Sequence, residues 1–380
     1  MMDKSAPGKV FLRTQCSPVL PPPVFAGGAA RWVRENMLAG PGSALFTLAA
    51  ILAVVWLTPG LVRYLFLDAV WSSPDGAACR APGAGACWSF IARKLDYFLY
   101  ASYPREMVWR VNLCMAMGAV LAVWLLWPGA RRKGLGAALF FIVFPVTALV
   151  LLHGSAALGL PKAPTDLWGG IFLSMIVATV GIVMSLPGGV LLALGRRSRL
   201  PVVRFFSTLF IEFVRGVPFI TVLFMANTML PLFVPASWSP DRLLRPLVGV
   251  SLFASAYMAE IVRGGLQAIP KGQTEGAMAL GLGYWGTMRL IILPQALTVV
   301  IPGIVGIFIG LFKDTTLVAV VGIPDFLRTV ETARLDPAWA GPTLSATGYI
   351  FAGLFYWVFC FGMSRYSLMM ERRLSAGRKR

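Results

Sequence analysis

The sequence contains little charge and few residues suited to catalysis. Only 13% of its 380 residues are charged, whereas a soluble globular protein typically carries about 25%. Its single histidine, His153, has no carboxylate or cysteine at metal-ligand spacing, which favours a packed or interface residue over a ligand. No Gly-x4-Gly-Lys-Ser/Thr motif is present, so we do not expect the chain to hydrolyse ATP. A membrane-embedded enzyme would need clustered histidines or acids, and the sequence argues against that class.

Apolar residues are correspondingly abundant, at 57% with a mean hydropathy of +0.74. This composition indicates an integral membrane protein. We predict an all-α polytopic bundle of about eight spans, each near the ~20 residues that cross a bilayer. The predicted spans are 44–62, 108–127, 135–158, 168–194, about 219–234, 244–262, 298–321 and 349–368.

The positive charge of the chain marks orientation rather than nucleic-acid binding. The formal net charge is +18, but the cations gather in short runs beside apolar segments, and no base-stacking motif accompanies them. Positive runs at Arg131, Arg196 and the C-terminus fall on one side of an eight-span topology. By the positive-inside rule that side is cytoplasmic and holds both termini.

The spans divide the chain into four predicted parts. Residues 1–43 form a cytoplasmic tail without expected structure or a cleavable signal, and residues 44–164 form a three-span extension. Residues 165–370 form a five-span core, and residues 371–380 form a basic cytoplasmic tail. The first outer loop contains Cys79 and Cys87, which either form a disulfide or remain unpaired at the surface.

Within the core, Pro187-Gly188-Gly189 is expected to break the fourth span. The stretch 205–214 is amphipathic and lies at the inner surface, and Gly216-Val217-Pro218 ends it before the fifth span. Two i,i+3 ion pairs are expected at the cytoplasmic ends of the spans, as parts of a gate or scaffold. They are Glu212 with Arg215, and Glu260 with Arg263.

Polar residues inside apolar runs are candidates for a substrate path, because an ionisable group in hydrocarbon costs at least ~2.5 to 3.5 kcal/mol. Lys313, Asp314 and Thr315 interrupt the seventh span. They suit a ligand with one ammonium and one carboxylate; alternatively, Lys313 snorkels and Asp314 caps a helix break. Asn227 beside Met225 either lines an adaptable cavity or forms an interhelical hydrogen bond.

The loop over 270–290 is polar between two apolar spans and is predicted to be a docking element. After Pro270, residues 273–280 form about two helical turns, with Ala277, Met278 and Leu280 as an apolar patch. Gly281 suits a left-handed helix stop, and Gly283 permits a second turn before a short helix begins at Tyr284. The alternative is an ordinary loop between spans, which would explain the polarity but not the spacing of these residues.

This loop resembles the signature of bacterial ABC-importer permease subunits: Glu-Ala-Ala, three residues, Gly, nine residues, Ile-x-Leu-Pro. The residues on that spacing are Glu275, Gly276, Ala277, Gly281, Ile291, Leu293 and Pro294. Gly276 departs from the family's alanine, which softens the helix by roughly 0.5 to 1 kcal/mol. The stretches SAYMAEIVRGGLQAIPKG and GLFKDTT resemble the polar-amino-acid branch, especially permeases for general L-amino acids. The close resemblance covers a little over half the chain.

The resemblance implies a permease subunit of an ATP-driven importer that moves L-amino acids from the periplasm across the bacterial inner membrane. Two ABC ATPases would bind the docking loops and hold ATP and Mg, while this chain holds no cofactor. A second permease would complete the path, and the three-span extension favours a heterodimer. A periplasmic amino-acid-binding protein would deliver substrate. The alternative is an ion-driven secondary transporter, which would show an inverted repeat and broken helices in corresponding halves.

Overall fold

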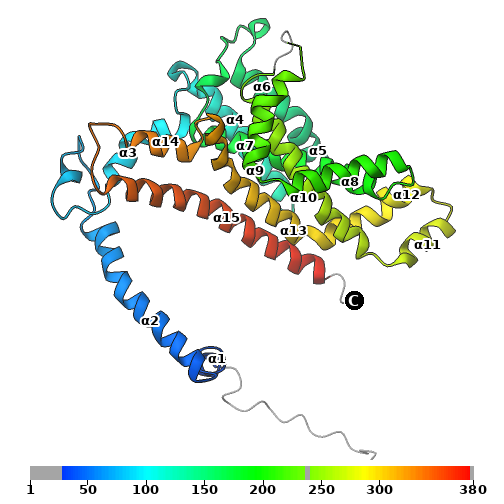
Figure 1. Ribbon diagram of the computed structural model, residues 1–380, viewed down its shortest axis with the longest axis horizontal. Coiled ribbons are helices and arrows are strands. Elements are labelled where there is room, and N and C mark those ends of the chain that lie inside the picture. Colours follow the sequence, from blue (N-terminus) through cyan, green and yellow to red (C-terminus); the bar gives the residue numbers. More distant parts are fainter. Residues whose placement is uncertain (1–27, 236–239, 377–380) are drawn as a thin grey trace, which may run out of the picture. The chain divides into compact units, whose positions relative to one another are not determined.

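The structure, a computed structural model, describes residues 28–235 and 240–376 and divides into two compact units, residues 1–67 and 68–380 (Figure 1). All regular elements in the described residues are helices, which confirms the all-α class. The α-helices are α1 (Ala29–Asn36), α2 (Pro41–Val62), α3 (Trp88–Tyr100), α4 (Val108–Leu126), α5 (Lys133–Ala138), α6 (Phe144–His153), α7 (Gly170–Arg196), α8 (Pro201–Gly216), α9 (Phe219–Phe224), α10 (Leu244–Gln267), α11 (Lys271–Ala279), α12 (Tyr284–Thr287), α13 (Leu293–Asp314), α14 (Phe326–Ala333) and α15 (Leu344–Ala376).

π-helical and 3-10 turns extend several of these helices. The π-helices are Arg63–Leu67, Leu139–Val143, Met225–Met229 and Met288–Ile292. The 3-10 helices are Ala78–Arg80, Arg105–Met107, Ala156–Leu158, Thr165–Leu167, Leu230–Leu232 and Thr315–Val321. In the described residues seven helices are long and apolar enough to cross a membrane. The number is eight if the bent pair formed by α8 and α9 is counted as one span. The expectation of about eight spans is therefore confirmed.

The first unit contains one candidate span. α2 begins at Pro41, where the missing N–H costs nothing, and it has no buried residue in the structure. The expectation of an unstructured tail over 1–43 is wrong for Ala29–Asn36, because the apolar and the charged residues of this stretch fall on different faces of a short helix, α1. Residues 1–27 lie outside the described residues.

The segment expected as an outer loop after the first span contains a helix. α3 buries Phe90, Ile91 and Phe98 against Phe326 and the long α15. Its charged residues obscured this face in the sequence. α4 and α6 pack together as the second and third spans, and α6 ends at His153, before the expected Leu158, because Gly154 turns the chain at a φ of 88°.

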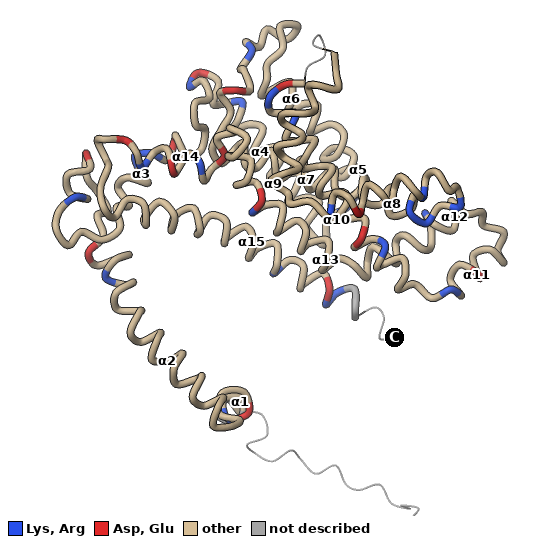
Figure 2. Tube along the Cα trace, in the orientation of Figure 1, with Lys and Arg blue, Asp and Glu red and all other residues tan. Residues whose placement is uncertain are grey.

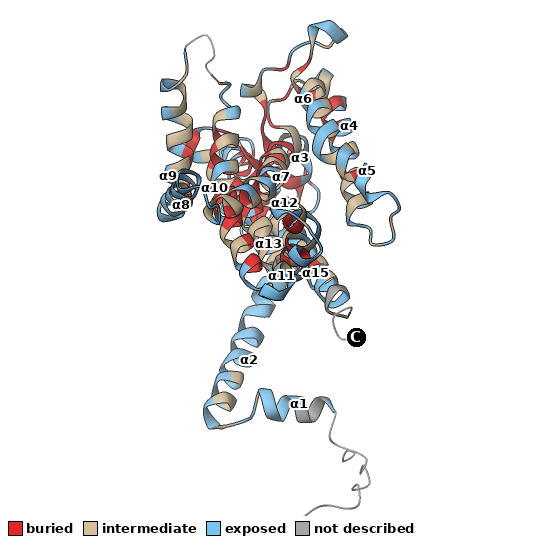
Figure 3. Ribbon diagram, turned by 90° about the vertical axis from the view of Figure 1, so that its right-hand side faces the viewer, coloured by how far each residue is buried: buried red, intermediate tan, exposed pale blue. Residues whose placement is uncertain are grey.

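α7 and α10 pack most extensively and form the centre of the second unit, where Figure 3 shows the buried residues gathered. Glycine makes this contact close: a Cβ at Gly189 would lie 2.5 Å from Cγ of Met258, and one at Gly181 would lie 2.8 Å from Val250. The predicted break at Pro187-Gly188-Gly189 is wrong. α7 runs unbroken, because packing of these glycines against α10 compensates for the one hydrogen bond that Pro187 removes.

α8 and α9 form a sharply bent pair, with an angle of 112° between them at the predicted break after Gly216. α8 buries only Ile211 and Val214, while Phe206 and Phe213 on another face are exposed. The expected amphipathic helix is thus confirmed. Figure 2 shows that the charged residues of α15 lie toward its C-terminal end.

Candidate functional site

The segment between α10 and α13 folds into two short helices joined by a tight turn (Figure 1). α11 starts directly after Pro270, whose backbone is still extended. Gly281 has a φ of +79°, in the left-handed region, and its N–H donates to the carbonyl of Met278 at 2.9 Å. α12 then begins at Tyr284. The helix after Pro270, the stop at Gly281 and the second short helix are therefore all found as expected.

These two helices present an apolar surface to the outside of the chain. Leu280 is 81% exposed and Trp285 70% exposed, and Met278 is also exposed. Ala277 was expected in the same patch but is buried at 2%, because α11 packs against the π-helix Met288–Ile292 and against α12. Glu275 is exposed beside the patch. The result is a projecting surface that combines one carboxylate with several apolar side chains.

The beginning of α13 anchors this segment. Nε2 of Gln295 donates to Oε1 of Gln273 at 3.2 Å, which ties α13 to α11. Pro294 lies in the first turn of α13, and Leu293 before it is partly buried. The π-helix Met288–Ile292 immediately precedes them, where a widened turn accommodates a proline that has no N–H to donate. Leu293 and Pro294 thus belong to the base of the segment, and Glu275 to its exposed surface.

Lys313, Asp314 and Thr315 lie where α13 changes to a 3-10 helix. The Lys313 side chain is exposed, Asp314 is half-buried, and Thr315 is buried with its hydroxyl donating to the carbonyl of Phe312 at 2.8 Å. Asp314 coincides with the helix change, but its side chain accepts no capping hydrogen bond there. Within the described residues its carboxylate has no hydrogen bond or ion pair.

Met225 and Asn227 lie in the π-helix Met225–Met229. Oδ1 of Asn227 is buried, and no hydrogen-bond partner for it occurs in the described residues. The backbone carbonyl of Asn227 accepts from Nη1 of Arg245 on α10 at 3.4 Å. No hydrogen bond or ion pair in the described part of the chain joins this group to Lys313–Thr315, although α9 packs against the 3-10 helix that follows α13.

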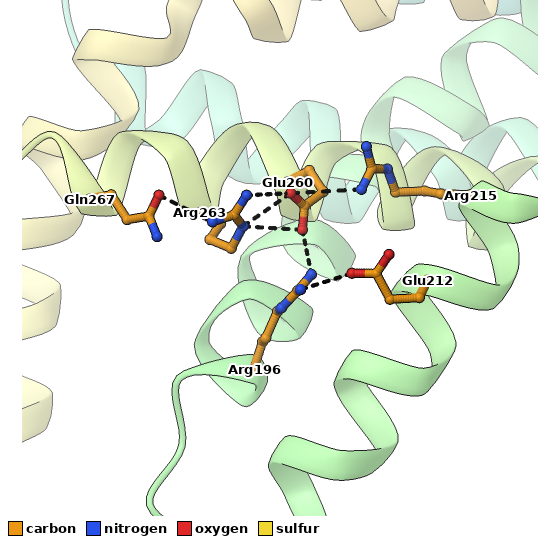
Figure 4. A network of polar contacts seen from close by, with 6 residues as sticks. All are labelled: Arg196, Glu212, Arg215, Glu260, Arg263 and Gln267. Atoms are coloured by element: carbon orange, nitrogen blue, oxygen red, sulfur yellow. Dashed lines mark hydrogen bonds and ion pairs between the residues drawn. The ribbon is translucent and has the colours of Figure 1, made fainter.

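A network of ion pairs joins α7, α8 and α10, centred on Glu260 (Figure 4). Arg196 Nη1 lies 2.6 Å from Glu260 Oε1, and its Nη2 lies 2.8 Å from Glu212 Oε1. Arg263 donates to Glu260 through Nε and Nη2, the latter at 2.7 Å, and Arg215 Nη1 lies 3.7 Å from Glu260 Oε2. Glu260 is the most buried member, with a side chain 16% exposed.

Sequence spacing predicted this network only in part. The Glu260–Arg263 pair forms as expected, whereas the expected Glu212–Arg215 pair is wrong: Glu212 pairs with Arg196, and Arg215 turns toward Glu260. The missed member is Arg196, which the sequence offers only as part of a basic run at the end of a span. Helix-to-helix packing brings it to Glu260.

The segment 68–104 closes over α14 and the start of α15. Cys79 and Cys87 form a disulfide with their Cα atoms 5.6 Å apart. The N–H of Cys87 donates to the hydroxyl of Thr347 at 3.0 Å, and Lys94 pairs with Asp336 at 2.5 Å. The extension before the core is therefore joined to the far end of the chain by buried and charged contacts.

Asp325 is a buried carboxylate outside the candidate spans that the sequence did not single out. It caps α14, accepting from the N–H groups of Leu327 at 3.0 Å and Arg328 at 3.1 Å. Burial raises the pKa of its carboxyl group to about 7, although these two hydrogen bonds act in the opposite direction. An aspartate directly before an apolar-periodic stretch was the available signal.

Comparison with known proteins decides the family. Residues 185–376 match the model of the "Binding-protein-dependent transport system inner membrane component" family. The chain is 48% identical to the inner membrane amino-acid ABC transporter permease protein YhdY of Escherichia coli K12, over 91% of this chain and 93% of the relative. The chain belongs to this family.

Two further proteins are similar to this chain. The permease protein BztC of a glutamate/glutamine/aspartate/asparagine transport system in Rhodobacter capsulatus is 39% identical over 96% of this chain and 98% of its own length. The solved structure called "Crystal structure of an amino acid ABC transporter with histidines" is 25% identical, covers 54% of this chain and 92% of its own, and has a TM-score of 0.47.

The chain is thus an ABC-importer permease subunit, a membrane component and not an enzyme. The family match contains the docking segment, the Glu260 network and both groups of candidate substrate-path residues. It does not contain the segment 68–104 with Cys79 and Cys87. That segment lies within the long alignments to YhdY and BztC, because these cover more than nine-tenths of the chain.

Proposed function

We propose that this permease moves L-amino acids from the periplasm to the cytoplasm, driven by a separate ABC ATPase that binds α11 and α12. The observation that carries the proposal is the projecting pair of short helices built on the Glu275-Gly276-Ala277 signature. They form a surface with an exposed acid and apolar side chains, which residues 268–270 join to α10 and the π-helix Met288–Ile292 joins to α13. The similarity to YhdY and BztC, both permeases of amino-acid transport systems, supports amino acids as the substrate class.

The proposal includes the partners of the complex. A pair of ATPases holds ATP and Mg, a periplasmic amino-acid-binding protein delivers substrate, and a second, different permease completes the path. Both termini and the docking segment lie on the cytoplasmic side. The four-part division at residues 43, 164 and 370 also belongs to the proposal. In this division α15 contains the last span and extends into the basic tail. Residues 377–380 of that tail lie outside the described residues.

Substrate is proposed to pass near Met225, Asn227, Lys313, Asp314 and Thr315. The carboxylate of Asp314 and the buried Oδ1 of Asn227 support this assignment, because neither has a partner in the described residues. A desolvated polar group without a partner is costly, and a polar ligand would offset that cost.

The test is ATP-dependent uptake of labelled L-amino acids into proteoliposomes that contain this chain, its co-purifying ATPase and second permease, and the binding protein. Glu275→Lys should abolish uptake while leaving membrane insertion intact. Glu106→Lys is the matched control, since it makes the same charge change at an exposed residue outside the docking segment. Uptake driven by a proton or sodium gradient without ATP would instead support a secondary transporter.

A further inference from the structure

The Glu260 network lies at the place where two moving parts of the proposed importer would meet. On one side, α10 ends at Gln267, and only residues 268–270 separate it from α11. Arg263 joins this last stretch to Glu260, since its Nη1 donates to Oε1 of Gln267 at 3.1 Å. A displacement of α11 by a bound ATPase would therefore reach Glu260 through residues 268–270 and the hydrogen-bonded last turns of α10.

On the other side, the network reaches the bend between α8 and α9. Arg215 lies in the last turn of α8, directly before the 112° bend, and contacts Glu260 at 3.7 Å. Arg196 bridges Glu260 and Glu212, so that α8 is attached at both residues (Figure 4). α8 buries Ile211 and Val214 and packs against α7 and α10, and these ion pairs tie it to the same two helices.

The charges of the network make Glu260 its necessary centre. Three guanidinium groups, from Arg196, Arg215 and Arg263, face two carboxylates. Exposed surface pairs contribute little, but Glu260 is largely shielded from water and accepts hydrogen bonds from charged donors, which are the stronger class. If Glu260 loses its charge, Glu212 is the one carboxylate left in the network to balance three guanidinium groups. α8 and α10 then lose the group that connects them.

We infer that Glu260 is a positioning residue that transmits movement of the ATPase-docking helix α11 to the bent pair α8–α9. The inference rests on the proposed function and names the connection between its docking segment and the transport path. In this role Glu260 contacts neither substrate nor ATPase. It holds α10 and α8 so that they move together, and its loss uncouples ATP hydrolysis from uptake.

The experiment compares Glu260→Gln with wild type in the reconstituted complex, measuring uptake and ATP hydrolysis in the same vesicles. Loss of a charge-assisted connection of this kind should lower the amino acid taken up per ATP by roughly tenfold, while hydrolysis stimulated by the binding protein continues. Glu331→Gln is the matched control, because Glu331 forms an i,i+3 pair with Arg328 on α14, away from α11. It should leave the ratio unchanged.

Other outcomes overturn the inference. A proportional fall of uptake and hydrolysis in Glu260→Gln would show a structural role only, and an unchanged ratio would show no role. If Glu260→Gln does not assemble, Arg215→Gln decides: it removes the contact of Arg215 with Glu260, together with the cation–π contact of Arg215 with the ring of Tyr257. It should still lower the ratio, and an unchanged ratio refutes the inference. Absence of ATP-dependent uptake in wild type would instead refute the proposed function.

Discussion

Two glycines of the docking segment should respond to alanine in opposite directions. Gly276 lies inside α11, and a Cβ there would meet no atom within 4 Å. Gly276→Ala should therefore stabilise α11 by about 0.5 to 1 kcal/mol, the usual difference between these residues in a helix. Gly281 is equally uncrowded but has a φ of +79°. There an L side chain costs about 1 to 2 kcal/mol.

Together the two effects give a difference of roughly 1.5 to 3 kcal/mol in the stability of α11 between the two variants. Even the smaller value changes the equilibrium between the closed and the opened helix about tenfold. Hydrogen–deuterium exchange of peptides covering 268–285 measures that equilibrium. Exchange should slow in Gly276→Ala and accelerate in Gly281→Ala, relative to wild type. Gly281→Asn is the control, since asparagine tolerates the left-handed conformation better than alanine.

Uptake should follow the same order, because a docking helix that opens more often offers its surface to the ATPase less often. Gly281→Ala should reduce ATP-dependent uptake, Gly281→Asn should restore part of it, and Gly276→Ala should preserve it. Equal exchange rates in Gly276→Ala and Gly281→Ala would refute the reasoning, because it assigns opposite effects to a helical backbone at Gly276 and a left-handed backbone at Gly281.

Three further predictions concern the rest of the second unit. Gly189→Val should lower the midpoint of thermal unfolding in detergent, because its Cβ would lie 2.5 Å from Cγ of Met258 and overpacking costs about 1 to 3 kcal/mol; an unchanged midpoint would contradict the close α7–α10 contact. Burial raises the pKa of Asp325 to about 7, so the folded chain keeps a proton that the unfolded chain has lost above pH ~4. Stability should fall by up to about 1.4 kcal/mol per unit between pH 5 and 7 and level off above, and Asp325→Asn should remove this dependence in a pH series of unfolding midpoints. Cys79→Ser opens a disulfide between residues 8 apart in sequence and should cost ~2 to 3 kcal/mol, an effect that dithiothreitol should reproduce on wild type but not on the variant.

The docking segment could be predicted because its geometry is local. Pro270 restricts its backbone φ angle, and Gly281 and Gly283 allow angles that other residues avoid. The few residues between them leave room for two short helices joined by a turn. α3 could not be predicted in the same way. Phe90 and Phe98 acquire an apolar environment only when Phe326 and α15 arrive from the other end of the chain. Their burial depends on contacts that no sequence window contains.

The π-helices had a local signal that span prediction does not use. Three of them end two residues before a proline: Leu139–Val143 before Pro145, Met225–Met229 before Pro231, and Met288–Ile292 before Pro294. A proline within a continuing helix leaves one carbonyl without its partner, and a widened turn before it relieves the clash of the ring. The candidate residues Met225 and Asn227 therefore lie in a widened turn because Pro231 follows two residues after it.

The run Arg196-Arg197-Ser198-Arg199 predicts the orientation of a span but not the ion-pair network. A basic run gives the orientation of a span whichever of its members is paired, because the rule counts charges near the membrane. The structure separates the members: Arg196 is partly buried between Glu212 and Glu260, while Arg197 and Arg199 are exposed without an ion pair in the described residues. Only the packing of α7 against α10 distinguishes them, since it brings the last residue of α7 to a glutamate 64 positions later. Arg197 and Arg199 can therefore maintain orientation if Arg196 is replaced, so an effect of that replacement on transport would report the network and not the topology.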